Sequence, residues 1–371
     1  LKYLKYVEKK LDLKKDILFN NKITSAKYLE KKNIWQIKTN KNKVLLCKYL
    51  ICAVGSLSSA NIPKIKGLNT YEGKYYHTGR WPKRKVNLKN KVVAQIGTGS
   101  SGIQVAPAIA QKVKKLVIFQ RTPNYSIPAR NKKLTKEIIN NYLKNYKKIK
   151  NLIKKTPGGH TFNFPTRSVF DFNKIERDRI FEKAWLKGSL SFRACFGDIT
   201  KKLDANKKAS NFIKEKILNT VKDKNVAKIL TNFDHPFTSK RPTLNTNYYE
   251  IFNRDNVELI DLKTNPIIKI TKKGIKTKNN EFFFDKIIFA TGYDALTGPL
   301  LSLNLVGKKN IKLKNFWSKL PKTYLGLMIP NFPNLFIIQG PGSPSVLTNV
   351  PVQIEQHVEW ITNCLKFLNR K

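Results

Sequence analysis

The sequence predicts an α/β fold with two domains. Buried apolar strands recur along the chain and several end in glycine, and one of them is followed by a glycine-rich turn, a helical pattern and a second buried strand. Strands that alternate with helices in this way are typical of parallel sheets covered by helices. The length of 371 residues is enough for about two domains of ordinary size.

The clearest unit lies at residues 92–120. We predict a strand at Val92–Ile96, a turn at Gly97–Gly102, a helix from Ile103 to Lys112 and a second strand at Leu116–Gln120. In a G-x-G-x-x-G turn, the first glycine permits the tight turn, the second lets the backbone approach a pyrophosphate, and the third lets the helix pack on the strand. Free N–H groups at the helix N-terminus then bind the phosphates. The predicted dinucleotide-binding residues are Gly97, Thr98, Gly99, Ser100, Ser101 and Gly102.

The end of the second strand indicates which dinucleotide binds. An NAD site places Asp or Glu about 20 residues after the glycines, where it binds the ribose 2′-OH. Here the strand ends in Gln120-Arg121-Thr122-Pro123, without an acid. Arg121 can pair with a 2′-phosphate through two hydrogen bonds. We therefore predict NADP, with Arg121 and Thr122 beside the phosphate, although Arg121 could instead be an ordinary surface arginine.

Residues 131–235 are predicted to be mostly helical and are rich in lysine. Apolar residues recur at spacings of three and four from Leu134 to Ile153, which predicts one helix packed on a core, with a partner-binding or membrane-surface helix as the alternative. Short strands lie on both sides of this segment. The other predicted elements are strands at 34–37, 44–47, 49–55, 257–260, 267–270, 281–284, 285–292 and 334–338, and a helix at 352–368.

The chain is strongly basic, with 72 Lys and Arg against 24 Asp and Glu, a net charge of +48. Such a charge can indicate a nucleic-acid or anionic-membrane partner. However, the lysines are spread from Lys2 to Lys371 and are not interleaved with aromatic residues as a base-stacking surface requires. We expect no specific nucleic-acid partner, and a non-enzymatic basic binding protein stays as an alternative.

The cysteines do not form a metal or redox motif. Cys47, Cys52, Cys195 and Cys364 include no C-x-x-C pair, so we predict no metal site and no dithiol site. The chain also contains no apolar run of about 18 residues and no signal-peptide pattern. We expect no membrane insertion and a cytoplasmic location.

Residues 71–82 read Tyr-Glu-Gly-Lys-Tyr-Tyr-His-Thr-Gly-Arg-Trp-Pro. This segment resembles the fingerprint F-x-G-x-x-x-H-x-x-x-W-[PD] of Baeyer–Villiger monooxygenases, with tyrosine in place of phenylalanine, and it lies upstream of the glycine-rich turn as in that family. We expect His77 to be a structural or hinge residue in the connector between domains, and Trp81 to pack there. The fingerprint residues are Tyr71, Gly73, His77, Trp81 and Pro82.

The resemblance extends over nearly the whole chain and is close to the phenylacetone and cyclohexanone monooxygenase branch. The further similar segments are residues 119–123, 239–242, 248–250, 253–257, 290–294, 340–345 and 354–360.

The resemblance implies an FAD- and NADPH-dependent enzyme that inserts one oxygen atom of O2 beside a ketone carbonyl, giving an ester or lactone. In this family NADPH reduces FAD, and oxygen then forms a flavin C4a-peroxide. Arg241 matches the active-site arginine, which would stabilise that anion and the charge on the adduct oxygen. Lys240 would bind the 2′-phosphate beside Arg121. The rival within the superfamily is an N- or S-oxidising flavin monooxygenase, which would not need Arg241.

The resemblance also implies residues near the flavin. Gly55 and Gly292 would end two strands that approach it. The loop from Gly340 to Ser345, with Leu347, would lie beside the isoalloxazine ring and the substrate, although a plain turn is the alternative.

Two Rossmann-like, dinucleotide-binding domains follow from the resemblance. An NADP domain at residues 59–251, with a helical insertion at about 131–235, would interrupt an FAD domain formed by residues 1–58 and 252–371. Members of the family begin with an FAD unit that has its own G-x-G-x-x-G. This chain contains one such motif and does not begin with Met. We therefore expect a partial chain that lacks the first FAD unit and is inactive alone.

Overall fold

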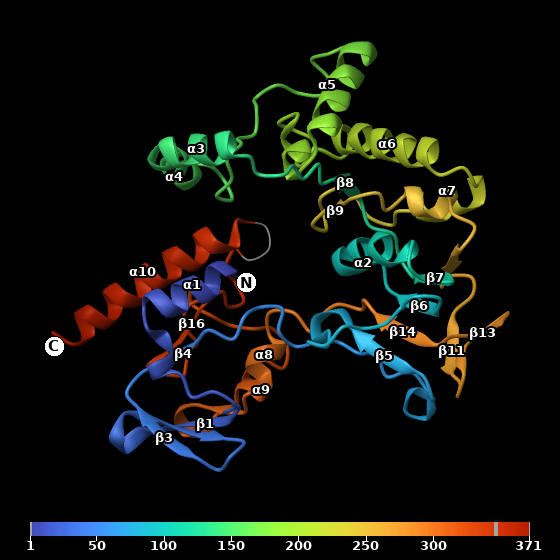
Figure 1. Ribbon diagram of the computed structural model, residues 1–371. Coiled ribbons are helices and arrows are strands. Elements are labelled where there is room, and N and C mark those ends of the chain that lie inside the picture. The colour runs from blue at the N-terminus through green and yellow to red at the C-terminus, as the bar shows by residue number, and fades with distance from the viewer. Residues whose placement is uncertain (1, 345–347, 371) are drawn as a thin grey trace. The chain divides into compact units, whose positions relative to one another are not determined.

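The computed structural model describes residues 2–344 and 348–370, which form two compact units (Figure 1). Unit 1 comprises the described parts of residues 1–59, 294–345 and 353–371, and unit 2 comprises those of 60–293 and 346–352.

The first boundary lies close to the predicted one, but the second does not. We expected the FAD domain to resume at residue 252, whereas residues 252–293 belong to unit 2. The reason is strand pairing: β10 (Val257–Asp261) and β14 (Lys286–Phe289) hydrogen-bond to strands of the glycine-turn unit. The assignment of FAD to unit 1 and NADP to unit 2 stays a prediction.

Unit 2 is built around a five-stranded parallel sheet in the order β10-β7-β6-β14-β5. Its other three strands are β5 (Lys74–His77), β6 (Val92–Ile96) and β7 (Lys115–Gln120). Parallel sheets are buried on both faces, which explains the continuous apolar runs in these strands. The carboxyl ends of all five strands lie at one edge, where ligands bind in open α/β sheets.

Opposite faces of the sheet pack on different partners. Leu116 and Ile118 of β7 join a core with Ile103 of α2 (Ser100–Ala110). Val117 and Phe119 join a second core with residues of an antiparallel sheet. That sheet consists of β11 (Ile267–Ile270), β12 (Gly274–Thr277) and β13 (Glu281–Phe283).

The segment predicted as helical is helical in the structure. Its helices are α3 (Lys136–Lys144), α4 (Tyr146–Lys155), α5 (Lys174–Lys187), α6 (Leu203–Thr220) and α7 (Lys224–Thr231). A short parallel pair, β8 (Ser126–Pro128) and β9 (Thr243–Asn245), flanks them in the sequence. The core of this region contains an aromatic cluster in which Phe212 stacks on Phe181 and contacts Trp185.

The helix predicted over Leu134 to Ile153 was wrong in two respects. The stripe is divided between α3 and α4 at Asn145, whose side-chain amide donates back to the carbonyl oxygen of Asn141. Neither helix buries a residue, so the apolar stripe does not pack on a core formed by the described residues. Periodicity reports an amphipathic face but not what covers it.

Unit 1 contains two smaller sheets. The first is an antiparallel meander of β1 (Ile23–Leu29), β2 (Ile34–Thr39) and β3 (Val44–Cys47), extended by β15 (Leu305–Val306). The second pairs β4 (Leu50–Cys52) with β16 (Leu335–Ile337) in parallel. The indole of Trp35 is fully buried and donates to the carbonyl oxygen of Pro333 over 2.9 Å. The other helices are α1 (Lys2–Lys10), α8 (Gly298–Leu301), α9 (Leu313–Phe316) and α10 (Val350–Leu368).

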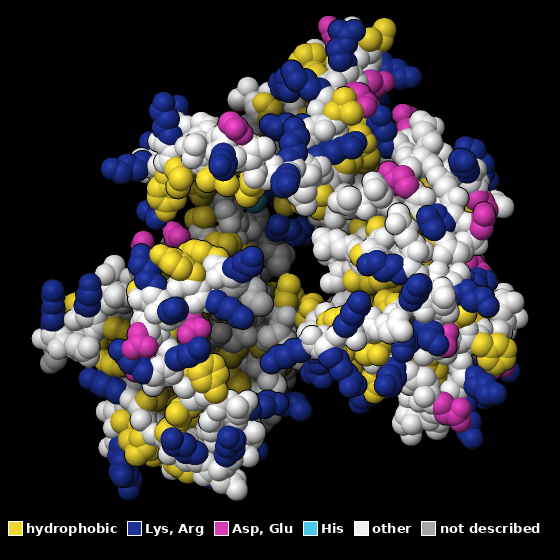
Figure 2. Space-filling model, viewed as in Figure 1, with side chains coloured by type: hydrophobic (Ala, Val, Ile, Leu, Met, Phe, Trp, Pro, Cys, Tyr) yellow, Lys and Arg dark blue, Asp and Glu magenta, His cyan; other side chains and the backbone are white. Residues whose placement is uncertain are grey.

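Basic side chains are abundant on the surface (Figure 2). Figure 2 shows Lys and Arg side chains distributed over the displayed face rather than gathered in one patch. Among the helices of the described residues, none combines the length and the apolar character that a membrane crossing requires.

Candidate functional site

The glycine-rich turn connects β6 to α2, and each glycine in it meets a different condition. Gly97 has a φ of +103°, and a Cβ there would lie 2.5 Å from the carbonyl oxygen of Ala290. A Cβ on Gly102 would lie 2.3 Å from the carbonyl oxygen of Gly97. A Cβ on Gly99 would meet nothing within 4 Å. The fold therefore requires the first and third glycines, whereas the open space at Gly99 is available to a ligand.

Gln95 stabilises the conformation of the turn by hydrogen bonds to its backbone. Its side chain is fully buried, and its amide nitrogen donates to the carbonyl oxygens of Gly97 at 3.1 Å and Gly102 at 3.2 Å. Gly99 and Ser100 are exposed at the start of α2. The free N–H groups and the positive end of the helix dipole there suit a pyrophosphate.

The residues predicted to select NADP lie at the same sheet edge. Arg121 and Thr122 follow β7 directly, and the Thr98 hydroxyl donates to the carbonyl oxygen of Thr122 over 3.5 Å. The side chain of Arg121 is exposed. The turn and the end of the next strand are thus in contact, as the strand–turn–helix–strand pattern predicts.

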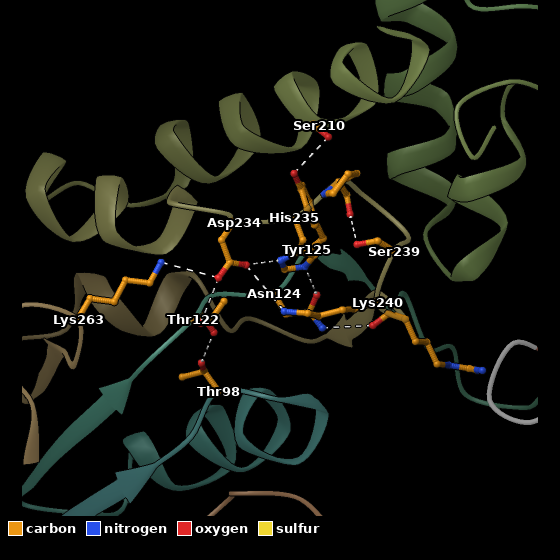
Figure 3. A network of polar contacts seen from close by, with 12 residues as sticks. Thr98, Thr122, Asn124, Tyr125, Ser210, Asp234, His235, Ser239, Lys240 and Lys263 are labelled. Carbon is orange, nitrogen blue, oxygen red and sulfur yellow. Dashed lines mark hydrogen bonds and ion pairs between the residues drawn. The ribbon is translucent and has the colours of Figure 1, made fainter. Parts of the chain in front are cut away.

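An acidic residue also lies at this edge, which the sequence analysis missed. The Thr122 hydroxyl donates to the carboxylate of Asp234 over 3.5 Å, and His235 Nδ1 lies 2.7 Å from the same group (Figure 3). The hydrogen bond from His235 is the main cause that lowers the pKa of Asp234 below its usual value, so the carboxylate is ionised at neutral pH. Asp234 is 112 residues from Thr122 in the sequence, and no local spacing indicates their contact.

Lys240 reaches the same cluster. Its ammonium lies 3.8 Å from the carboxylate of Asp234, and its side chain is 55% exposed. Lys263, to which the sequence analysis gave no role, lies 3.9 Å from that carboxylate. The structure therefore brings Lys240 and Thr122 together, with Asp234 between them.

Arg241 follows Lys240 and is exposed. Its carbonyl oxygen accepts a hydrogen bond of 3.2 Å from the side-chain amide of Asn124, which ties it to the segment after β7. Burial, followed by the positive charges of Arg193 and Arg241, lowers the pKa of His160. Arg241 and Arg193 thus both contribute positive potential at His160.

Aromatic rings support this basic group. The ring of His160 stacks on Phe162, with 4.9 Å between their centroids, and the guanidinium of Arg193 lies 5.6 Å from the centroid of Phe162. The His160 Nε2 and Arg193 Nε atoms are buried without a hydrogen-bond partner among the described residues. Neither Arg193 nor His160 was predicted as a site residue from the sequence, because stacking on a shared ring leaves no spacing signal.

Two fingerprint residues form a structural contact in unit 2. The Tyr71 hydroxyl donates to the carbonyl oxygen of Phe284 over 2.8 Å, and burial raises the pKa of Tyr71. A Cβ on Gly73 would lie 2.4 Å from the ring of Tyr71. Glycine is therefore needed at position 73, because the ring of Tyr71 occupies the space that a Cβ would fill. The hydroxyl adds a hydrogen bond that the family's phenylalanine cannot make.

His77 lies in a sheet and not in a connector, which corrects the expected location. It ends β5, the edge strand of the parallel sheet, and pairs in register with Phe289 of β14. The amide of Gly79 donates to Nδ1 at 3.0 Å, so Nε2 carries the proton and donates to the carbonyl oxygen of Gly292 at 3.0 Å. His77 thereby connects the fingerprint to the glycine after β14.

The end of the fingerprint is only partly packed. The ring of Trp81 lies 5.4 Å from that of Tyr76, and 37% of Trp81 is exposed. Pro82 is half-buried. Trp81 therefore packs against Tyr76, as expected, but more than a third of it stays exposed to solvent.

The residues predicted near the flavin have features that suit close approach of a ligand. Gly55 and Gly292 have φ values of +76° and +79°, and a Cβ on either would meet nothing within 4 Å. The amide of Gly340 donates to the carbonyl oxygen of Gly326 over 3.1 Å, which fixes the start of its loop. Ser345 and Leu347 lie outside the described residues.

Comparison with known proteins places these features in a family. A family model for pyridine nucleotide-disulphide oxidoreductases matches residues 1–165. A cyclohexanone 1,2-monooxygenase of Acinetobacter is 40% identical over 99% of this chain and 67% of its own length. A Baeyer–Villiger monooxygenase of Pseudooceanicola batsensis is 39% identical over 98% of this chain and 67% of its own.

Solved structures agree with the sequence relatives. The structure of OTEMO in complex with FAD and NADP is 36% identical, covers 100% of this chain and 71% of that one, and has a TM-score of 0.97. The chain thus spans about two thirds of the length of the relatives that it matches. The resemblance found in the fingerprint is confirmed over the whole chain, and the chain belongs to the Baeyer–Villiger monooxygenase family.

Proposed function

We propose that this chain belongs to an FAD- and NADPH-dependent monooxygenase that inserts one oxygen atom of O2 beside a ketone carbonyl, giving an ester or lactone. The observation that carries this function is its identity of 35–40% to Baeyer–Villiger monooxygenases over nearly the whole chain. Reduced FAD supplies the electrons and the site at which O2 is activated. A cytoplasmic location and the absence of a specific nucleic-acid partner stay predictions of the sequence.

We infer that the edge of the parallel sheet in unit 2 binds NADPH. The open space at Gly99 and the N-terminus of α2 would hold the pyrophosphate. Arg121, Thr122 and Lys240 would contact the 2′-phosphate. The contact between Thr98 and Thr122 supports this assignment, because it links the turn to the segment that carries Arg121.

We further propose that Arg241 stabilises the negative charge that develops on oxygen during insertion. A guanidinium stays protonated at any pH at which the enzyme works, and a fixed positive charge near developing negative charge lowers the activation barrier. The positive charges of Arg193 and Arg241 act on the same histidine, His160, whose pKa both lower, and this shared positive potential supports the role. The open space at Gly292 is compatible with a cofactor that approaches the end of β14.

The test is Arg241→Ala in the enzyme loaded with FAD and NADPH, with cyclohexanone as the ketone. We expect ester formation to fall by at least about a hundred-fold, as for the loss of one preorganised electrostatic group, while FAD remains bound. Arg179→Ala, which removes an exposed arginine on α5, is the matched control and should keep full activity. Ester formation at the parent rate in Arg241→Ala would remove Arg241 from the mechanism and favour N- or S-oxidation, which a sulfide substrate would then reveal.

A further inference from the structure

Asp234 lies where the phosphate of NADPH is expected to bind. Its carboxylate accepts from the Thr122 hydroxyl at 3.5 Å and from His235 Nδ1 at 2.7 Å. The ammonium groups of Lys240 and Lys263 lie 3.8 Å and 3.9 Å from it (Figure 3). One carboxylate is thus the common anion for a hydroxyl, an imidazole and two lysines.

Lys263 is held at this edge by the backbone. The amide of Leu262 donates to the carbonyl oxygen of Gln120 over 2.8 Å, which joins the end of β10 to the end of β7. The amide of Lys263 in turn donates to the carboxylate of Asp261 over 2.9 Å. These bonds place Lys263 next to the Arg121–Thr122 segment independently of Asp234.

A ribose 2′-phosphate requires the same kind of partners that Asp234 already has. Phosphate monoesters are bound by lysines, arginines and hydroxyl groups, and Thr122 and Lys240 are proposed for that purpose. A fixed carboxylate among them repels the phosphate and keeps the lysines paired. A ribose 2′-OH is uncharged, so it meets no such repulsion and can donate to a carboxylate, as it does in NAD sites.

We propose that Asp234 is a specificity-determining residue that opposes the 2′-phosphate and so narrows the preference of this site for NADPH over NADH, and that Lys263 is a further phosphate-binding lysine. The proposal rests on the assignment of this edge to NADPH. Asp234 acts as an internal anion that the 2′-phosphate must displace from Lys240 and Lys263. Its carboxylate is 47% exposed, so solvent screens the repulsion and the expected effect is moderate.

The test measures binding without turnover, using adenosine 2′,5′-bisphosphate and adenosine 5′-monophosphate at low ionic strength. Replacing Asp234 with Asn removes the charge and keeps the shape. We expect Asp234→Asn to bind the bisphosphate about three- to fivefold more tightly, the scale of one exposed charge pair, with unchanged affinity for the monophosphate. Lys263→Gln should weaken bisphosphate binding by a similar factor and leave monophosphate binding unchanged. Calorimetry on the parent and the two variants gives all six dissociation constants.

Asp204→Asn is the matched control. Asp204 lies in the first turn of α6 and pairs with Lys207 at 3.3 Å, so the substitution makes the same change in net charge at an exposed ion pair. We expect it to change neither affinity. Tighter bisphosphate binding in both Asn variants would assign the effect to net charge and overturn the proposal.

Two further outcomes would also overturn it. Weaker bisphosphate binding in Asp234→Asn would mean that the carboxylate positions the lysines for the phosphate, and unchanged binding would mean that it does not oppose the phosphate. The assignment of the edge to NADPH fails separately, when the parent protein itself binds the bisphosphate no more tightly than the monophosphate.

Discussion

The ring of His77 is held in one tautomer by two backbone groups, the amide of Gly79 and the carbonyl of Gly292. It is 2% exposed, and burial is the main cause that lowers its pKa below the ordinary value of 6.5. The unfolded chain therefore binds a proton more readily than the folded one. The stabilising contribution of neutral His77 is complete above pH 6.5 and is lost as the pH falls through the lower folded pKa.

We expect His77→Ala to lower the free energy of unfolding by about 1–3 kcal/mol at pH 7.5, because two hydrogen bonds to buried backbone groups are lost. The variant should also lose less stability than the parent between pH 7.5 and pH 5.5. Urea unfolding at the two pH values measures both effects. An equal loss in parent and variant would show that His77 does not contribute to the acid sensitivity.

Arg121 is the second residue whose role is open to a direct test. A charge-assisted hydrogen bond contributes about 1.5–3 kcal/mol, so Arg121→Ala should weaken NADPH binding by about ten-fold or more. NADH lacks the 2′-phosphate, and its affinity should not change. Fluorescence titration of both cofactors is sufficient, and an unchanged NADPH affinity would exclude Arg121 from the phosphate site.

At the level of the element, two glycines of the glycine-rich turn have different roles: Gly102 is needed for stability, and Gly99 is proposed to leave space for the cofactor. Gly102→Ala places a Cβ 2.3 Å from a backbone oxygen, so the turn or α2 must move, at a cost of about 1–3 kcal/mol for overpacking. Gly99→Ala meets nothing within 4 Å, so we expect its stability to stay within about 1 kcal/mol of the parent. NADP+ binding should nevertheless weaken in Gly99→Ala, because its methyl group occupies the space proposed for the pyrophosphate.

Thermal unfolding and NADP+ titration of both variants distinguish these effects. Each variant serves as the control for the other. A Gly99→Ala protein that is stable and binds NADP+ like the parent would contradict the location of the pyrophosphate.

At the level of the whole molecule, the charge of +48 has a consequence of its own. The basic side chains are dispersed over the displayed face, so this face offers general electrostatic attraction to polyanions (Figure 2). We expect weak binding to DNA duplexes at low salt, with equal affinity for unrelated sequences and a linear decrease of log K with log salt. Fluorescence anisotropy with two unrelated duplexes measures this, and a marked preference for one sequence would favour the basic binding protein instead.

The sequence by itself determined the features that depend on neighbouring residues. The strand–turn–helix–strand unit was predicted correctly because a G-x-G-x-x-G turn, a buried strand and a helix N-terminus are local in the chain. The fingerprint was also sufficient to identify the family, although it did not reveal that His77 belongs to a strand.

Only the tertiary structure decided which distant segments meet. Strand pairing with β6 and β7 placed residues 252–293 in unit 2, and a hydrogen bond joins Asp234 to Thr122 across 112 residues. In the same way, the amphipathic pattern of α3 and α4 left open what covers their apolar faces. Periodicity and spacing record the conformation of a segment, whereas hydrogen-bond partners and charge pairs between remote segments depend on how the whole chain packs.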